Sequence, residues 1–178
     1  MRDHLVETAT RLIARRGTAG LTVREIAKEA RVATGVLYNH FADKEELIAL
    51  GLHGHVQAVE RDLPPLPSDE EAVEVALVAY TKRALELHKG IVPAFVNLAP
   101  EVLERFVALG NPAAGGLGLR EQLAAYLRRR RVADPLAEAA ATMIIGACHE
   151  VTVRQRGGVP DRFADDLATI VLTGIQVR

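Results

Sequence analysis

Residues 22–47 start helices at short intervals, and this spacing is the strongest constraint on the fold. Thr22 and Glu25 have the S/T-x-x-E spacing of a capping box, in which each side chain bonds the backbone N–H of the other residue. Asp43 and Glu46 repeat the arrangement with aspartate as the cap. Between the two starts there is room for the helix that begins at Thr22 and for one more short helix, and a further helix precedes them at the N-terminus. We therefore expect a compact unit of three short helices followed by a longer one.

Helical periodicity continues through the rest of the chain. Apolar residues near the N-terminus recur at i, i+4, i+7 and i+8, as on one face of a helix: Leu5, Ala9, Leu12 and Ile13. Ser68 and Glu71 repeat the cap spacing and predict a helix from 68 to about 89. Other helices are predicted over 43–62, 119–131, 134–156 and from Asp161 to 177. No strand-like alternation is present, so the sequence predicts an all-α fold of nine or ten helices.

Prolines and glycines divide this series of helices. The segment PPLP at 64–67 ends the fourth helix, because proline cannot continue it. Pro93 and Pro100 are expected to separate two shorter helical pieces that end near Gly110. The segment NPAAGGLG at 111–118 is predicted to be a flexible loop.

The charge and the single cysteine limit the possible partners and compartments. The formal net charge is −1, so binding to a nucleic acid would have to come from a local basic patch. Residues 1–44 do carry eight basic side chains against five acidic ones, a net charge of +3. Cys148 is the only cysteine, which excludes an intrachain disulfide and fits a reducing compartment. We expect a cytoplasmic protein without a signal peptide, and apolar runs such as 167–175 are too short to cross a bilayer.

The short segment 33–41 has two different faces if it is helical. At about 100° per residue, Ala33, Leu37 and Phe41 share one arc and can pack on the neighbouring helices. Gly35 and Asn39 lie on the opposite side, which therefore has no bulk at the glycine. A helix that enters a DNA major groove needs such a face, because a small residue allows close approach and Asn can address base edges.

The stretch TVREIAKEARVATGVLYNHFADKEEL, residues 22–47, resembles the DNA-binding signature of the tetracycline-repressor (TetR) family. The likeness lies in the T-V-R-x-I-A opening, the L-Y-x-H-F segment and the K-E-x-L helix start, and it extends over residues 3–50. It implies a three-helix helix-turn-helix DNA-binding domain at 1–48, and a helical ligand-binding and dimerisation domain at 49–178. The implied function is a transcriptional repressor that binds a palindromic operator in double-stranded DNA as a homodimer and is released by a small-molecule effector.

The resemblance also implies which residues meet DNA. Contacts from the second helix would come from Thr22 and Arg24, base-facing positions are Thr34, Gly35, Val36 and Asn39, and phosphate-holding positions are Tyr38, His40 and Lys44. Three residues depart from the family pattern. Ala33 replaces a frequent polar cap, Thr34 stands where a basic residue is common, and Val36 replaces a frequent threonine. Fewer hydrogen bonds to bases are then available, which affects the operator sequence more than DNA binding itself.

Two further sets of residues are assigned to the second domain. Apolar stripes on the last two helices could pair with a second subunit as a four-helix bundle. The residues expected at this dimer interface are Met143, Ala147, Val151, Leu167, Ile170, Val171 and Gly174. Residues on the middle helices could line a pocket for a mostly apolar effector. These candidates are Tyr80, His88, Phe95, Asn97, Phe106, Tyr126 and His149.

Other functions are less well supported by the sequence. We expect neither an enzyme nor a cofactor, because no nucleophile–base pair has motif support. A metal site is not expected, since His53 and His55 are two residues apart and point away from each other on a helix. The alternative function is a helical small-molecule carrier or protein-interaction module that no longer reads DNA. The set Tyr38, His40 and Lys44 favours the DNA-binding interpretation over this alternative.

Overall fold

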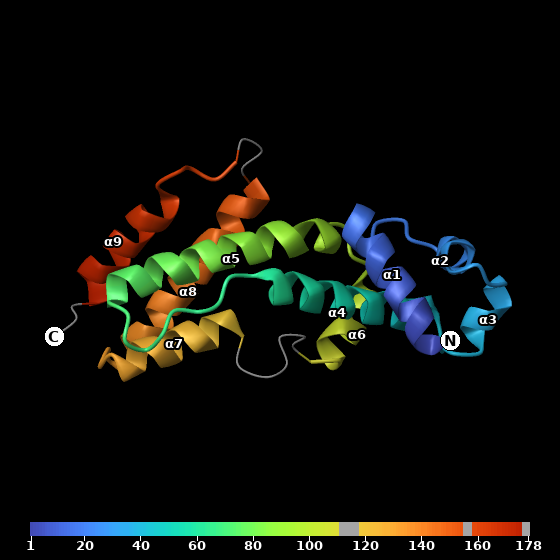
Figure 1. Ribbon diagram of the computed structural model, residues 1–178, viewed down its shortest axis with the longest axis horizontal. Helices are drawn as coiled ribbons and strands as arrows, with labels where there is room; N and C mark the ends of the chain where they lie inside the picture. The colour runs from blue at the N-terminus through green and yellow to red at the C-terminus, as the bar shows by residue number, and fades with distance from the viewer. Residues whose placement is uncertain (111–117, 155–157, 176–178) are drawn as a thin grey trace. The chain divides into compact units, whose positions relative to one another are not determined.

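The computed structural model describes residues 1–110, 118–154 and 158–175, and this part of the chain folds into nine α-helices without strands (Figure 1). The all-α prediction is therefore confirmed. Packing divides the chain into two compact units. Unit 1 takes residues 1–62 and the described residues from Gly90 to Gly110, and unit 2 takes Leu63–Lys89 and the described residues from Gly118 onward. This division by packing differs from the functional boundary at residue 48, which stays a prediction, because the fourth helix continues through that position.

Unit 1 surrounds one apolar core. The helices α1, α2, α3, α4 and α6 cover Arg2–Arg16, Val23–Ala30, Thr34–Tyr38, Lys44–Asp62 and Pro100–Ala108. Their apolar faces meet in a cluster that includes Leu5, Ile13, Ile26, Leu37, Phe41, Leu47 and Leu52. The last residues of α5 (Val73–Phe95) also belong to this unit, where Thr18 Oγ1 donates to the carbonyl of Ala94 at 2.7 Å.

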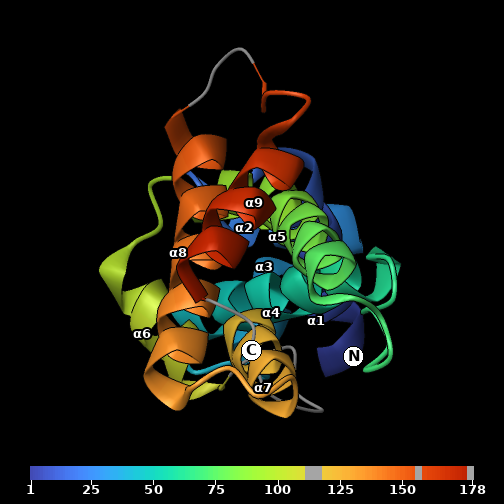
Figure 2. The same cartoon turned by 90° about the vertical axis from the view of Figure 1, so that its left-hand side faces the viewer.

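Unit 2 holds the rest of α5 together with α7 (Leu119–Arg129), α8 (Asp134–Arg154) and α9 (Phe163–Ile175). Figure 2 shows α8 with α7 and α9 packed against it. The core of this unit is built around the fully buried side chains of Leu77, Leu123, Tyr126, Leu127, Ile144 and Cys148. The Tyr126 hydroxyl leaves the core at one end and donates to the carbonyl of Glu71 at 2.9 Å.

Three local predictions are wrong in detail. The helix expected from Ser68 begins at Val73, because residues 68–71 form a turn in which the Glu71 N–H bonds the Ser68 carbonyl at 3.2 Å. Pro93 does not separate two helices, since α5 continues to Phe95 and the proline lies in its last turn. The helix predicted over 33–41 has only five residues, and Ala33 is exposed outside it with an extended backbone. The predicted loop at 111–118 lies outside the described residues except for Gly118.

The crossing of α1 over α4 brings the two backbones unusually close. A Cβ placed on Gly51 of α4 would lie 2.8 Å from the Cβ of Ala9 and 3.1 Å from Cδ1 of Ile13. The same crossing is bridged by a hydrogen bond of 3.1 Å from Thr10 Oγ1 to the Gly51 carbonyl. Glycine at 51 and alanine at 9 are therefore required for this packing, and any larger side chain would separate α1 from α4.

One helix exceeds the apolar length expected from the sequence. By length and composition alone, α8 could cross a membrane, and about a third of its apolar window (33%) is buried in the structure. The expectation that every apolar run is too short is wrong for this helix on that criterion. A single helix of this kind is weak evidence for a membrane span, because core helices satisfy the same test. The buried residues Ala137, Ala141, Ile144 and Cys148 give α8 one continuous face in the core of unit 2.

We predict that Gly51→Ala lowers the free energy of unfolding by about 1–2 kcal/mol, because the overpacking cost of about 1–3 kcal/mol exceeds the helix-propensity gain of up to about 1 kcal/mol. Urea titration followed by circular dichroism measures the change. Gly35→Ala is the matched control, since it also adds one methyl to a helical glycine of unit 1 but meets no atom within 4 Å. An equal or higher stability for Gly51→Ala would show that the α1–α4 crossing relaxes easily.

Candidate nucleic-acid interface

The start of α2 is fixed by the predicted capping box. Thr22 Oγ1 accepts a hydrogen bond from the Glu25 N–H at 3.3 Å, and the Thr22 N–H donates to Glu25 Oε2 at 2.9 Å. Arg16 at the end of α1 reaches the same carboxylate at 2.8 Å. The Arg16 guanidinium and the bonds from Thr22 lower the pKa of Glu25 to about 2. The carboxylate therefore stays ionised at neutral pH and holds the α2 start against the end of α1.

The turn between α2 and α3 depends on one residue in the left-handed region. Arg31 ends α2 with φ 58° and ψ 42°, and its N–H bonds the Lys28 carbonyl at 3.2 Å. The Val32 N–H then bonds the Ala27 carbonyl at 3.0 Å. Ala33 occupies the position before α3 with φ −69° and ψ 143°, but it offers no side-chain cap. The turn is thus closed by backbone bonds, and His4 Nε2 lies 3.3 Å from the Ala30 carbonyl just before it.

Buried side chains from α3 and the turn after it determine which face of α3 points outward. Leu37 is 2% exposed and Phe41 is 4% exposed, and both lie in the core of unit 1. The guanidinium of Arg2 lies 5.1 Å from the centre of the Phe41 ring, a cation–π contact that sequence reasoning missed. With these two residues held inside, the opposite side of the helix must face out. Ala33 does not join them, contrary to the helical arc predicted for it.

The outward face carries the residues that the sequence assigned to DNA. Gly35, Asn39, Tyr38 and His40 are exposed, and Tyr38 is 60% exposed although it is aromatic. No atom lies within 4 Å of the position that a Cβ on Gly35 would take. The remaining predicted positions are also accessible: Thr34 and Val36 are half-buried, and Thr22, Arg24 and Lys44 are exposed. The nine residues therefore lie on the surface of α2, α3 and the start of α4.

The start of α4 is tied to distant parts of unit 1. Asp43 Oδ1 accepts from the Glu46 N–H at 2.8 Å, and Glu46 Oε2 accepts from the Ala42 N–H at 2.7 Å, which confirms the predicted aspartate cap. Each carboxylate also pairs with an arginine: Glu46 with Arg2 at 3.0 Å, and Asp43 with Arg105 of α6. These two arginines hold the start of α4 in place. No local sequence motif predicts this role, because they lie 44 and 62 residues away from their partners in the sequence.

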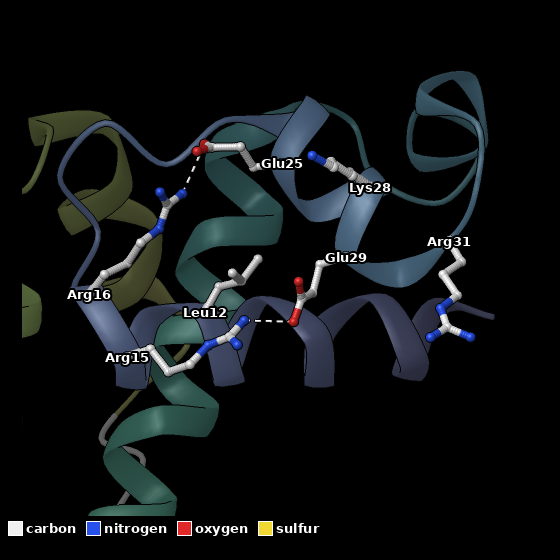
Figure 3. A pocket seen from close by; sticks show the side chains of 7 residues that line it. All are labelled: Leu12, Arg15, Arg16, Glu25, Lys28, Glu29 and Arg31. Carbon is white, nitrogen blue, oxygen red and sulfur yellow. Dashed lines mark hydrogen bonds and ion pairs between the residues drawn. The ribbon is translucent and has the colours of Figure 1, made fainter.

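A charged groove of about 490 Å³ lies between α1 and α2 (Figure 3). We call it the α1–α2 groove, and its lining residues are Leu12, Arg15, Arg16, Glu25, Lys28, Glu29 and Arg31. Arg15 pairs with Glu29 at 2.6 Å, as Arg16 does with Glu25. Lys28 and Arg31 border the groove without an ion pair to any described residue, so the groove has an excess of positive charge.

The candidate effector residues fall into separate places. Tyr80 and Tyr126 form one ring pair in unit 2, with centroids 5.9 Å apart, and burial raises the pKa of both phenols. His88 and His149 form a second pair in unit 2 at 5.4 Å, and burial lowers the pKa of His88. Phe95 and Phe106 meet at 5.2 Å in unit 1. Asn97 is exposed with φ 58°. The structure thus brings these residues together only in pairs.

The candidate dimer residues lie on α8 and α9 and differ in exposure. Met143 and Ile170 are 53% and 60% exposed, Gly174 is exposed, and a shallow hollow of about 140 Å³ lies among them. Ala147 and Leu167 are half-buried. Val151 and Val171 are 8% and 3% exposed and belong to the core of unit 2. These two valines can therefore support an interface from behind but offer little surface to a partner.

No group of three metal-ligating side chains comes together among the described residues. The two histidines of α4 are separate: His55 bonds the Gly90 carbonyl at 3.1 Å, and His53 lies 6.3 Å from the Phe106 ring.

Comparison with known proteins agrees with this geometry. The family described as bacterial regulatory proteins, tetR family, matches residues 5–50. The transcriptional regulator HbdR of Aromatoleum sp. (strain CIB) is 33% identical over 63 residues, 35% of this chain and 28% of that protein. The transcriptional repressor KstR2 of Mycobacterium tuberculosis (strain ATCC 25618 / H37Rv) is 45% identical over 53 residues, 30% of this chain and 26% of that protein. The matches thus span only about a quarter of these relatives.

The fold comparison extends over the whole chain. A crystal structure of BioQ with its double-stranded DNA operator superposes with a TM-score of 0.55 and 22% identity, covering 100% of this chain and 99% of that one. At this identity the likeness shows the fold. The matched segment shows that residues 5–50 belong to the tetR family of bacterial regulatory proteins, and the rest of the chain shares the fold.

We predict that Ala33→Ser raises the free energy of unfolding by about 0.5–1 kcal/mol, because a serine side chain can accept an N–H of the uncapped first turn of α3. The backbone of Ala33 already has the extended geometry of an N-cap. Urea titration of the free protein checks this, with Ala33→Val as a control that cannot cap. Equal stability of the serine and valine variants would contradict the missing-cap explanation.

Proposed function

We propose that this protein is a DNA-binding transcriptional repressor that recognises a palindromic operator as a homodimer and is released by a small-molecule effector. One observation carries the proposal: α3 turns a bare glycine and an exposed Asn39 outward while Leu37 anchors its other side in the core. A short helix held in this way can approach base edges in a major groove. The operator-bound state of BioQ and the name of the repressor KstR2 support the same function.

The proposed contacts divide by chemistry. Thr34, Gly35, Val36 and Asn39 face the bases, where the glycine gives clearance and the amide can bond adenine. Tyr38, His40 and Lys44 hold phosphates beside them, and Thr22 and Arg24 contact the groove or backbone from α2. Lys44 is exposed in the first turn of α4, where its ammonium can reach a phosphate. Its ion pair to Glu45 is long, at 3.6 Å.

We predict that Gly35→Ala weakens binding to the operator at least tenfold while raising the free energy of unfolding by up to about 1 kcal/mol. The added methyl meets no protein atom, so any loss of binding must arise at the DNA. The operator is first selected from a random duplex library, and anisotropy titrations then give the dissociation constants. Gly146→Ala, a helical glycine of unit 2 that is equally unobstructed, is the control and should leave binding unchanged. Unaltered binding by Gly35→Ala would remove the close approach on which the proposal relies.

The proposed homodimer uses the exposed apolar face of α8 and α9. Leu136, Met143 and Ile170 expose large apolar side chains there, and Gly174 adds no bulk. Two such faces related by a twofold axis would bury one another and set two α3 helices on successive turns of the major groove. A palindromic operator follows from this symmetry.

We predict that Ile170→Asp converts the dimer to a monomer, because an aspartate at this face would have to be desolvated without a partner. Sedimentation equilibrium measures the mass, and the operator affinity should fall with the loss of the second half-site. Val107→Asp is the matched control, since Val107 of α6 is similarly exposed, at 67%, but lies outside this face. A dimeric Ile170→Asp variant would place the subunit contact elsewhere. A monomeric parent protein would exclude the homodimer.

The proposed effector site lies in unit 2 around the buried Tyr80–Tyr126 pair and the pair that buried His88 forms with exposed His149. The phenols of Tyr80 and Tyr126 and the ring of His88 are polar groups within an otherwise apolar core, which suits a mostly apolar ligand. The other three candidates, Phe95, Asn97 and Phe106, lie in unit 1 and are not part of this site. An effector that binds one conformation better would shift the population away from the DNA-binding form. Such regulation of transcription would take place in the cytoplasm.

A further inference from the structure

We propose that Arg24, Lys28 and Arg31 form a phosphate-binding stripe along α2, which holds the DNA backbone beside the bases that α3 meets. We call these three residues the α2 stripe. The inference rests on the proposed DNA binding and extends it, because Lys28 and Arg31 belong to no contact position considered above.

The spacing of the α2 stripe places its members on one side of the helix. Positions i and i+4 lie within an arc of about 40°, Arg31 follows as the residue that ends the helix, and the three extend over about 10 Å of helix axis. All three side chains are exposed. The stripe also begins at Arg24, which is already a proposed DNA contact, and ends three residues before α3. Along the chain it therefore leads directly into α3, whose outward side carries Gly35.

The acidic residues of α2 do not neutralise the stripe. Glu29 is held by Arg15 at 2.6 Å and Glu25 by Arg16 at 2.8 Å, so both carboxylates are occupied by arginines of α1. Lys28 and Arg31 remain without an ion pair to any described residue, at the border of the α1–α2 groove (Figure 3). Two cations with open space beside them can accept an anion without first breaking an internal pair.

The backbone at Arg31 adds an independent observation. Its φ of 58° is a conformation that costs a residue with a Cβ about 1–2 kcal/mol and that glycine adopts readily. An arginine at a position that favours glycine points to a role for its charge. Part of that role can be the interaction of the cation with the C-terminus of α2, so the experiment must separate stability from binding.

The arrangement fits a nucleic-acid backbone better than a compact anion. A single phosphate or carboxylate needs donors that converge on one point, whereas these cations follow a line. A linear polyanion with regularly repeated charges matches such a line, and duplex DNA carries one phosphate per 3.4 Å on each strand. An acidic peptide is the competing occupant, and the experiment includes it.

The test compares the parent protein with the double variant Lys28→Gln/Arg31→Gly in titrations of the selected operator duplex at several salt concentrations. Loss of two phosphate contacts should lower the slope of log K against log[salt] by about 1.8. Affinity at low salt should fall about tenfold, and the order of preference among duplex sequences should stay the same, because phosphates carry no sequence information. Glycine suits the backbone at 31, so the variant should fold.

The matched control is Lys82→Gln/Arg131→Gly in unit 2. It removes the same charge, and Arg131 is also an exposed arginine after a helix end with positive φ, at 64°. This control should keep the salt slope of the parent. A double variant of the stripe that also keeps the parent slope would overturn the inference, and so would a changed order of sequence preference, which would mean base contacts.

Two further outcomes separate this inference from the proposed function. In the first, the parent binds its operator and Gly35→Ala weakens that binding, but the stripe variant binds DNA as well as the parent and polyglutamate less well. The stripe is then a peptide site, and this inference fails while the proposed function stands. If the parent binds no duplex at any salt concentration, the proposed function fails and the stripe fails with it.

Discussion

The burial of Leu37 and Phe41 is the constraint on which the candidate interface depends. Helix α3 has five residues, and a helix of this length is not stable by itself because nucleation costs more than so few hydrogen bonds return. Burying each of these side chains contributes about 1.5–3 kcal/mol, which is enough to hold one turn in place. Because the two anchors fix the rotation of α3, they also decide that Gly35 and Asn39 face outward. The exposed face is a consequence of the buried one.

The parts of the fold that the sequence predicts are those set by neighbouring residues. The caps at Thr22 and Asp43 are local, since each bonds a backbone N–H three residues later, and both form as expected. Ser68 and Glu71 have the same spacing and yet start no helix. There a tertiary contact outweighs the local cap, because the Glu71 carbonyl accepts a hydrogen bond from the hydroxyl of Tyr126, 55 residues away. A cap motif predicts a possible helix start, and packing decides whether it is used.

The candidate site shows the same division. Accessibility of the α3 face follows from helical periodicity, so the sequence could predict it. The pairs Arg2–Glu46 and Asp43–Arg105 could not be predicted, because nothing in the spacing of such distant residues indicates that they meet. The effector candidates fail to gather for a related reason: aromatic and polar residues on a helix indicate a pocket only when their directions converge, and direction depends on how the helices cross. The sequence therefore predicted the exposed face of α3 better than it predicted a cluster of effector residues.

Local pairing explains how a chain with a net charge of −1 can present a basic surface. Four carboxylates of unit 1 cap helices or pair with arginines, so each already has a partner within the protein: Glu25, Glu29, Asp43 and Glu46. Lys28 and Arg31 have no such partner among the described residues, and Lys44 has a long ion pair of 3.6 Å to Glu45. Coulomb interactions fall steeply over about 8–10 Å at physiological salt, so a polyanion at α2 and α3 responds to these nearby cations rather than to the charge of the whole molecule. The acids of α2 thus leave Lys28 and Arg31 unpaired within the described part of the chain, because Arg15 and Arg16 already occupy the carboxylates of Glu29 and Glu25.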